Sequence, residues 1–417
     1  MDSHISISAD GALSRRVHDE FPKLIENTYL DSACIGIAPR RSVEAVSAFL
    51  RQVDECPEGS GTSRHSRLNE LRAAARPLAA RLIGAAPEDI AIVESTTHGL
   101  TIAAQSLPLS PGDMVAISDL EFIQMGVAWS QLESRGVRIQ PIRHVEGTLS
   151  VDRIRESLHS RVRVLALSSV QWTNGFRADL AAISAICEER GIWLVVDAAQ
   201  HLGALRMNVS QTPVDMLVCG GHKWLNSPFG AGVLYISPKV RERLNRPVAG
   251  FFSAKFPMGD SSWGESFLRR DTSPFREYEF SSNARTWEIG GTSNFPGGIA
   301  LSASLSLILE IGSAVVEERI FALTEHLFDG LSRTPFTIVS NRAMRHRSGI
   351  VTLTTGNGAA DVALMNHLLS IGVPVSVRYT SGVGGVRVSC HYYNTYGDVD
   401  RLLNGVTSWA DHEGWTS

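Results

Sequence analysis

The sequence contains few cysteines, and their arrangement does not suggest a cross-linked or metal-stabilised protein. Five cysteines are spread over 417 residues, without a CxxC pair. Disulfide-rich domains and structural zinc sites usually show even numbers of cysteines at short, fixed spacings. We therefore expect neither a disulfide framework nor a metal site.

Long apolar runs and a large excess of one charge are also absent. No segment approaches the ~18 uninterrupted apolar residues that a membrane helix requires. Residues Met1 to Glu20 are polar and lack the basic-then-apolar pattern of a secretory signal. The formal net charge of −4 argues against a nucleic-acid or polybasic membrane binder. We expect a cytoplasmic protein that acts on a small molecule, with no nucleic-acid or membrane partner.

Short apolar segments alternate with helical ones between about residues 70 and 240. The predicted helices include Leu68–Ile83, Gln124–Arg135 and Leu180–Arg190. The predicted strands include Ile90–Val93, Met114–Ile117, Val162–Leu167, Trp193–Val196, Met216–Cys219 and Gly232–Ile236. This alternation is typical of an α/β domain with a mainly parallel sheet. Ligands bind such sheets at the carboxyl ends of the strands, where the informative polar residues fall.

The chain is too long for one hydrophobic core, since cores stop growing at roughly 250–300 residues. We expect a large domain over residues 25–300 and a smaller α+β domain from residues 1–24 and 301–417. Between Pro247 and Trp287 the periodic pattern is lost, and long loops of this kind are usually functional. We expect this loop to shape a pocket for a bulky substrate through Phe251, Phe252, Trp263, Arg269 and Arg270.

An acidic residue, Asp197, follows the apolar strand Trp193–Val196 directly. Such a residue can cap a helix or lie in solvent. It can also pair with a buried cation, and a pyridinium nitrogen that is kept protonated in this way makes its ring an electron sink. Gln200, three residues later, can donate to a phenolic oxygen on the same ring.

A lysine, Lys223, follows another apolar strand after Gly220, Gly221 and His222. A lysine beside a cation or an apolar wall can lose its proton and attack an aldehyde. The adjacent His222 can donate a hydrogen bond to a phosphate. Together with Asp197, this lysine indicates a site for an aldehyde cofactor.

These two segments resemble the class V aminotransferase family of fold-type I pyridoxal-phosphate (PLP) enzymes, which includes cysteine desulfurases, selenocysteine lyases and isopenicillin-N epimerase-like proteins. The resemblance runs from Tyr29–Ala33 to Tyr393–Thr395. It implies a large domain with a seven-stranded, mainly parallel sheet and a small α+β C-terminal domain. It also implies roles in PLP binding, with Lys223 as the Schiff-base lysine, Asp197 on the pyridine nitrogen, Gln200 on the phenolic oxygen and His222 on the phosphate.

Further matches to the family extend the expected site. Thr96 and Thr97 follow a strand and open a helix, where they can cap the helix or, as the family implies, bind the phosphate. Thr292 lies in a Glu-x-Gly-Gly-Thr-x-Asn segment, and the family's threonine there reaches the phosphate of the neighbouring subunit. The resemblance therefore implies a homodimer with shared active sites. The family's arginine that holds the substrate carboxylate corresponds to Arg387.

The chain departs from the cysteine desulfurases at several positions. The stretch Arg378–Gly385 contains no cysteine where those enzymes carry the one that forms a persulfide. Phe122 replaces the histidine that stacks on the cofactor, so it can stack but cannot transfer a proton. Gly220 replaces a serine, which removes one phosphate hydroxyl.

The remaining departures leave alternatives open. Trp172 replaces an asparagine near the phenolic oxygen, and either Gln171 or Asn174 can substitute for it. Cys34 either borders the substrate or is an inert buried thiol.

These departures decide which reaction we expect. We expect a C–S lyase that acts by β-elimination on a cysteine-derived substrate in a specialised pathway, without persulfide formation, and with Lys223 moving the α-proton. An isopenicillin-N epimerase-like epimerase, an aminotransferase or a decarboxylating deaminase acting on a larger amino acid is the alternative. A non-catalytic protein with the PLP fold is the minor alternative.

Overall fold

The computed structural model describes residues 13–55, 59–250, 253–255, 270–271, 273–275 and 277–415. Four residues of the loop that we expected to shape a pocket, Phe251, Phe252, Trp263 and Arg269, lie outside the described residues. The role of that loop therefore stays a prediction.

The described residues form a seven-stranded sheet with the order β1-β7-β6-β5-β4-β2-β3. The strands β2 to β6 pair in parallel, and β7 is antiparallel to both β6 and β1. This mainly parallel sheet confirms the predicted fold class. The bounds are β1 Ile90–Val93, β2 Met114–Ser118, β3 Arg138–Ile142, β4 Val162–Ser168, β5 Trp193–Asp197, β6 Met216–Gly220 and β7 Gly232–Ile236.

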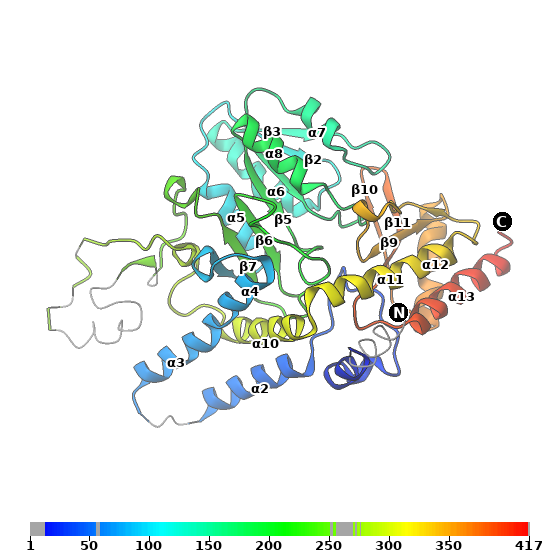
Figure 1. Ribbon diagram of the computed structural model, residues 1–417, viewed down its shortest axis with the longest axis horizontal. Coiled ribbons are helices and arrows are strands. Elements are labelled where there is room, and N and C mark those ends of the chain that lie inside the picture. The colour runs from blue at the N-terminus through cyan, green and yellow to red at the C-terminus, as the bar shows by residue number, and fades with distance from the viewer. Residues whose placement is uncertain are drawn as a thin grey trace, which may run out of the picture.

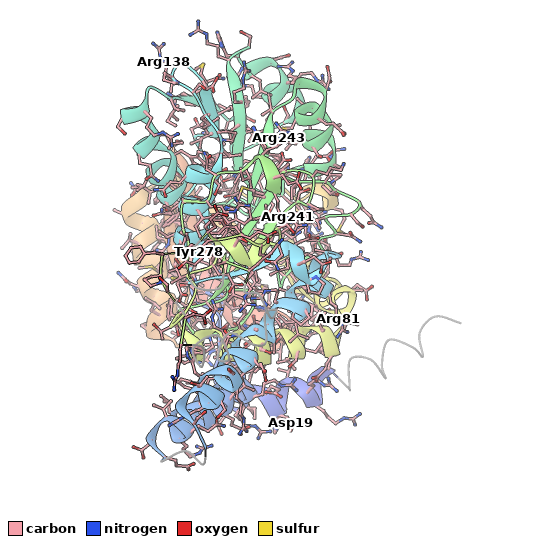
Figure 2. The ribbon with its side chains drawn as sticks, turned by 90° about the vertical axis from the view of Figure 1, so that its left-hand side faces the viewer. Asp19, Arg81, Arg138, Arg241, Arg243 and Tyr278 are labelled. Carbon is pink, nitrogen blue, oxygen red and sulfur yellow. The ribbon has the colours of Figure 1, made fainter. Side chains whose placement is uncertain are left out.

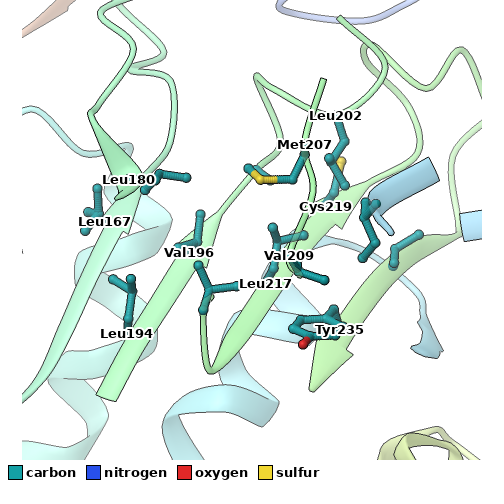
Figure 3. Packing of buried hydrophobic residues seen from close by; sticks show 14 of the residues in the cluster. Leu167, Leu180, Leu194, Val196, Leu202, Met207, Val209, Leu217, Cys219 and Tyr235 are labelled. Carbon is teal, nitrogen blue, oxygen red and sulfur yellow. The ribbon is translucent and has the colours of Figure 1, made fainter. Parts of the chain in front are cut away.

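Both faces of the sheet are buried, because successive side chains of each strand point to opposite sides. Leu194 and Val196 of β5 lie in one apolar cluster with Leu167 and Leu217 of the neighbouring strands (Figure 3). Val195 of β5 lies in the cluster on the other face. This two-sided burial explains why the strands appear in the sequence as continuous apolar runs.

Helices cover the two faces of this sheet (Figure 1). One apolar cluster includes residues of α4 (Ala75–Ile83), α7 (Val151–Ser157), α8 (Leu180–Arg190) and α10 (Phe295–Ile311). The other includes residues of α5 (Thr96–Ser106) and α6 (Ile123–Ser130). The helix predicted over 68–83 is in fact two helices, since α3 (Gly61–Ala73) ends just before α4 begins.

A second, four-stranded antiparallel sheet with the order β10-β11-β9-β8 lies beside the first (Figure 1). Its strands are β8 Thr337–Ile338, β9 Ile350–Thr354, β10 Ser376–Thr380 and β11 Val383–Ser389. The helices α11 (Ser313–Leu331), α12 (Gly358–Ser370) and α13 (Tyr396–His412) share its apolar cluster. The domain division predicted at residue 300 stays a prediction. That position falls inside α10, which packs on α3, α4 and α2 (Arg40–Asp54).

Charged side chains such as Asp19, Arg81 and Arg138 are exposed on the outside of the chain (Figure 2). In the described part of the chain, no single helix is long and apolar enough to cross a membrane. Among the described helices, α10 and α11, which meet at an angle of 79°, are together long and apolar enough to cross a membrane, but this concerns length and composition alone.

A buried carboxylate ties the start of α10 to the helices that precede the sheet. Glu288 is 1% exposed and accepts hydrogen bonds from Arg72 at 2.8 Å and from Arg76 at 2.6 Å. It also accepts the backbone N–H of Ile92 in β1 at 2.9 Å. Burial raises the pKa of Glu288, but Arg76 and Arg72 outweigh that effect and hold it at about 2.

We expect Glu288→Gln to lower the free energy of unfolding by about 3–5 kcal/mol at neutral pH, because it leaves a buried arginine without its counter-charge. The lowered pKa means that the carboxylate stabilises the fold above its ordinary pKa of 4.5 and loses this effect as the pH falls toward about 2. The difference from the wild type should therefore shrink below about pH 4.5 in urea unfolding. The matched control is Glu189→Gln, which breaks an exposed pair with Arg155 at 2.9 Å and should cost only about 0.2–1 kcal/mol. Equal losses in the two variants, or a loss that does not depend on pH, would contradict this account.

Candidate active site

A cavity of about 330 Å³ opens at the carboxyl ends of β4, β5 and β6. It brings together predicted site residues that are far apart in the sequence. Those that line it are Cys34, Thr96, Thr97, Phe122, Asp197, Gln200, His222, Lys223 and Arg387. A larger cleft of about 760 Å³ elsewhere contains neither Lys223 nor Asp197, so we place the chemistry in the smaller cavity.

Lys223 and Asp197 provide the opposite charges of this cavity. Lys223 follows β6 by three residues, and burial together with Arg387 lowers its pKa, while Asp197 opposes that change. A lowered pKa makes the free amine, which is the nucleophile, more available near neutral pH. The position of Lys223 is thus suited to attack on an aldehyde.

Asp197 is the last residue of β5 and is positioned by the next turn. Its Oδ1 accepts the backbone N–H of Ala199 at 2.8 Å. Burial raises its pKa, while the Ala199 N–H and Lys223 oppose the rise. The residues that follow form a turn, so Asp197 does not cap a helix. None of the hydrogen bonds among the described residues uses its Oδ2, which can therefore pair with a cation in the cavity.

Gln200 has an amide group whose orientation is set by two hydrogen bonds. Its Oε1 accepts the indole N–H of Trp224 at 2.6 Å, and its Nε2 donates to the carbonyl of Ala33 at 2.9 Å. The amide nitrogen carries two hydrogens, so one donor remains for a ligand oxygen.

The first turn of α5 offers an anion site at the same cavity. Ser95 caps the helix, since its hydroxyl accepts the N–H of His98 at 3.1 Å, which leaves Thr96 and Thr97 in the cavity wall. The hydroxyl of Thr96 accepts the N–H of Gly220 at 2.9 Å. The helix N-terminus and the hydroxyl groups together can bind a phosphate.

His222 lies beside this turn, and its ring stacks on Phe229 with centroids 5.0 Å apart. Burial, aided by Lys223, lowers the pKa of His222 to about 4. The ring is therefore neutral at pH 7 and has one N–H to donate.

On the opposite side of the cavity, Arg387 of β11 is 1% exposed. Its guanidinium donates to Asp31 at 3.2 Å and to the carbonyl of Trp172 at 2.9 Å, whereas its Nε has no hydrogen-bond partner within the described part of the chain. Burial lowers its pKa, and Asp31 opposes that effect. A buried guanidinium in this position can receive a substrate carboxylate.

A family model described as aminotransferase class-V matches residues 28–402. The chain belongs to the class-V aminotransferase family. One curated relative is a cysteine desulfurase of Klebsiella pneumoniae (strain 342), which is 27% identical, with 94% of this chain and 97% of the relative covered. This membership confirms the resemblance inferred from the motifs.

Solved structures share the fold. The apo cysteine desulfurase of Thermococcus onnurineus NA1 superposes with a TM-score of 0.81 at 22% identity, covering 95% of this chain and 98% of that one. A cystine C–S lyase in complex with its reaction product cysteine persulfide also has a TM-score of 0.81, at 24% identity, covering 93% and 99%. One solved structure with the same fold, at 23% identity, carries glycine covalently linked to its PLP cofactor. As a member of the class-V family, this chain is a PLP-dependent enzyme.

The cavity fits the PLP cofactor of the class-V family. It offers an amine at Lys223, an unshared carboxylate oxygen at Asp197 and an anion site at Thr96 and Thr97. A Cβ on Gly220 would lie 2.8 Å from the Thr96 hydroxyl and 3.1 Å from Nδ1 of His222. A larger residue at this position would therefore crowd Thr96 and His222.

Three expected ligands do not line the cavity. Gln171 donates instead to Glu121 at 2.8 Å, and Asn174 donates to the carbonyl of Gly147 at 2.8 Å. Thr292 is exposed and lies outside the cavity of its own chain. Trp172 does line the cavity, where its ring meets Phe122 edge-on with centroids 5.2 Å apart.

Sequence reasoning missed Glu121, which precedes the cavity residue Phe122. Its buried carboxylate accepts the N–H of Ser168 at 2.9 Å and the amide of Gln171 at 2.8 Å. Burial, with a smaller contribution from the charge of Asp197, raises the pKa of Glu121 to about 7. The hydrogen bonds from Ser168 and Gln171 oppose this rise. An acidic residue soon after an apolar strand, the pattern that revealed Asp197, could have identified it.

The segment that carries the persulfide cysteine in desulfurases is a tight hairpin here. Thr380 of β10 pairs with Val383 of β11, so only Ser381 and Gly382 form the turn, with φ angles of 47° and 81°. Two residues with positive φ are typical of a type I′ turn. The Ser381 hydroxyl donates to the carbonyl of Asp119 at 2.7 Å, which holds the turn against the large sheet's loops.

The described cysteines other than Cys34 are buried away from the cavity. Cys390, the one nearest to the hairpin in sequence, is 0% exposed, and burial raises its thiol pKa to about 12. It therefore stays protonated and is a poor nucleophile.

We expect Lys223→Ala to lose the visible absorbance of the lysine-bound cofactor, because no other described lysine lines the cavity. Borohydride reduction followed by intact-mass measurement should find a cofactor adduct on the wild type and none on the variant. Lys239→Ala, which changes an exposed lysine, is the control and should retain the adduct. An adduct on Lys223→Ala would show that another lysine holds the cofactor.

Proposed function

We propose that the chain is a PLP-dependent C–S lyase, which removes a thiol by β-elimination from a cysteine-derived amino acid without forming a persulfide on the protein. The observation that carries this proposal is the two-residue turn at Ser381 and Gly382. It leaves no cysteine-bearing loop above the cavity, so cleavage of the C–S bond would proceed without capture of sulfur there. The curated relatives are named as desulfurases, and the proposal departs from those names on this point.

A cystine C–S lyase has the same fold, so this fold can accommodate an enzyme that cleaves a C–S bond. Its likeness to this chain, at 24% identity, extends to the fold. The reaction proposed here converts an S-substituted cysteine and water into pyruvate, ammonia and the free thiol.

The roles of the chain's own residues follow from their positions. Thr96, Thr97 and His222 would hold the phosphate, Asp197 would hold a proton on the ring nitrogen through its Oδ2, and Gln200 would donate to the phenolic oxygen. When bound, PLP supplies the electron sink for the substrate's α-carbon.

Two further residues act on the substrate. Nζ of Lys223 would take the α-proton, and Arg387 would orient the substrate by its carboxylate. Phe122, which is 44% exposed at the cavity, would cover the ring and exclude water but cannot transfer a proton to the leaving sulfur.

We expect the wild type to release pyruvate and thiol in equal amounts from an S-substituted cysteine, measured by coupled dehydrogenase assay and thiol titration. Intact-mass measurement after turnover of L-cysteine should find no added sulfur atom on the protein. Lys223→Ala is the blank and should form neither product. Alanine as the product, with sulfur added to Cys34, would contradict the proposal in favour of a desulfurase. Deuterium exchange at Cα without pyruvate would indicate an epimerase, and consumption of a 2-oxo acid would indicate an aminotransferase.

We further propose that the enzyme is a homodimer in which Thr292 completes the phosphate site of the partner subunit. Thr292 is exposed and does not line the cavity of its own chain. A phosphate contact by this residue therefore requires a second chain.

A heterodimer with Lys223→Ala in one subunit and Thr292→Ala in the other tests the shared site. If Thr292 acts across the interface, one of the two sites is intact, and about half of the wild-type cofactor should bind with wild-type affinity. If Thr292 acted within its own chain, both sites would be damaged and no site with wild-type affinity would remain. If Thr292 had no role, the homodimer with Thr292→Ala in both subunits would bind the cofactor with wild-type affinity, which would also contradict the shared site. Two different affinity tags allow the heterodimer to be purified, and absorbance titration measures its cofactor content.

A further inference from the structure

We propose that Arg378 forms a second anion subsite in the cavity, so that the preferred substrate is a cysteine derivative whose sulfur substituent carries a carboxylate or a similar acidic group. This inference rests on the proposed lyase function for the reaction, but the binding preference can be measured without it. Neither the motifs nor the family likeness led us to expect a role for Arg378.

The β10–β11 hairpin directs two arginines to the same cavity. Ser376 lies opposite Arg387, and Arg378 lies opposite Gly385. Residues that are opposite each other, or two positions apart on one strand, project from the same face. Arg378 and Arg387 are therefore diagonal neighbours, a relation in which the two backbone positions are typically about 7–8 Å apart. Both side chains line the cavity.

The position of Arg378 is held by its surroundings. Gly385, directly opposite, has no side chain to compete for the same space. Near the tip of the hairpin, Ser381 donates to the Asp119 carbonyl at 2.7 Å, and His144 bonds the Ser381 carbonyl at 3.1 Å. The hairpin is thus attached to the large sheet's loops, and the arginine is presented from a fixed strand.

The two arginines differ in their charge partners. Arg387 has a carboxylate, since Asp31 lies 3.2 Å from its guanidinium. In the described ranges, Arg378 donates to the carbonyl of Val377 at 2.8 Å and to the sulfur of Cys34 at 3.6 Å, and to no other group. Among the described residues, no carboxylate lies within ion-pair distance of Arg378.

The charge balance of the cavity then favours a second anion. Arg378 and Arg387 both line it, and of the two only Arg387 has a carboxylate partner among the described residues, since Asp31 lies 3.2 Å away. Burial lowers the pKa of Arg387, and Arg378 lowers it further, which places the two guanidinium groups in each other's field. With Arg387 holding the α-carboxylate, a second acidic group on the substrate would neutralise the half-buried Arg378.

The subsite lies in the same cavity as the lysine that would bind the cofactor. Cys34, the contact of Arg378, lines the cavity together with Lys223. A leaving group that carries its own acidic group would be held at Arg378 while the C–S bond breaks. An apolar leaving group of the same size would form no ion pair with the guanidinium and would therefore bind less tightly.

A matched pair of substrates tests this subsite. S-Carboxymethyl-L-cysteine and S-carbamoylmethyl-L-cysteine have nearly the same shape, but only the first carries a second negative charge. We expect the wild type to favour the carboxymethyl substrate in kcat/KM by about tenfold to a hundredfold, which is the range for one charge-assisted contact. Arg378→Gln should reduce this preference to near unity with little change for the amide substrate, and Arg378→Lys should restore part of it. Arg155→Gln, at a distant exposed ion pair, controls for the general field and should leave the preference unchanged.

Two results would overturn the subsite. The first is a wild type without preference between the two substrates. The second is an equal decrease in kcat/KM for both substrates in Arg378→Gln, since Arg378 would then bind the α-carboxylate that both substrates share.

Spectral titration of the lysine-bound cofactor separates this inference from the proposed reaction. It reports binding of either amino acid, whether or not a product forms. Tighter binding of the carboxymethyl compound that depends on Arg378, without pyruvate from either compound, would support the anion subsite and contradict the proposed lyase reaction. Equal binding of the two compounds and equal formation of pyruvate from both would support the lyase reaction and contradict the anion subsite.

Discussion

The parallel pairing of β4, β5 and β6 is the constraint on which the rest of the site depends. The register places Ser168, the last residue of β4, beside Asp197, the last residue of β5. The next strand ends at Gly220, three residues before Lys223. Because parallel strands end at the same edge of the sheet, these polar groups converge although the chain separates them. The two-sided apolar burial that holds the strands together also removes water from Asp197 and Lys223, and this desolvation shifts the pKa values of both.

Three buried or half-buried arginine sites show how differently the same side chain is used. Arg72 is paired with Glu288, which links α3 to the segment before α10, although its Nε, like that of Arg387, has no partner among the described residues. Arg387 is paired with Asp31 but keeps one nitrogen without a partner in the cavity. Arg378 has no carboxylate among the described residues, although it lines the same cavity. Since a buried charge without a partner is costly, the first arrangement is typical of a structural site, and the last is typical of a site that receives a ligand.

The family membership and the local structure constrain the function to different degrees. The class-V match spans most of the chain, so the fold and the PLP cofactor are established. The reaction depends on the groups around the substrate, and the cavity is lined here by Phe122 and bordered by the tight β10–β11 turn. The proposal of a lyase rests on these two features, whereas the curated relatives are named as desulfurases.

The sequence by itself determined the parallel α/β sheet, the family and the residues Lys223 and Asp197. Each of these depends on local signals, namely apolar runs, glycine turns and polar residues at strand ends, which short segments carry on their own. It did not predict the break between α3 and α4, because a helical pattern continues through Ala74. Only the tertiary structure decided that Glu121 takes the amide of Gln171, that Thr292 lies outside its own cavity and that Arg378 stands beside Arg387. The contact of Glu121 with Gln171 and the position of Thr292 depend on segments far apart in the chain, and local patterns contain no information about such distant partners. The pairing of Arg378 with Arg387 depends on the register of the β10–β11 hairpin, which the sequence analysis did not assign.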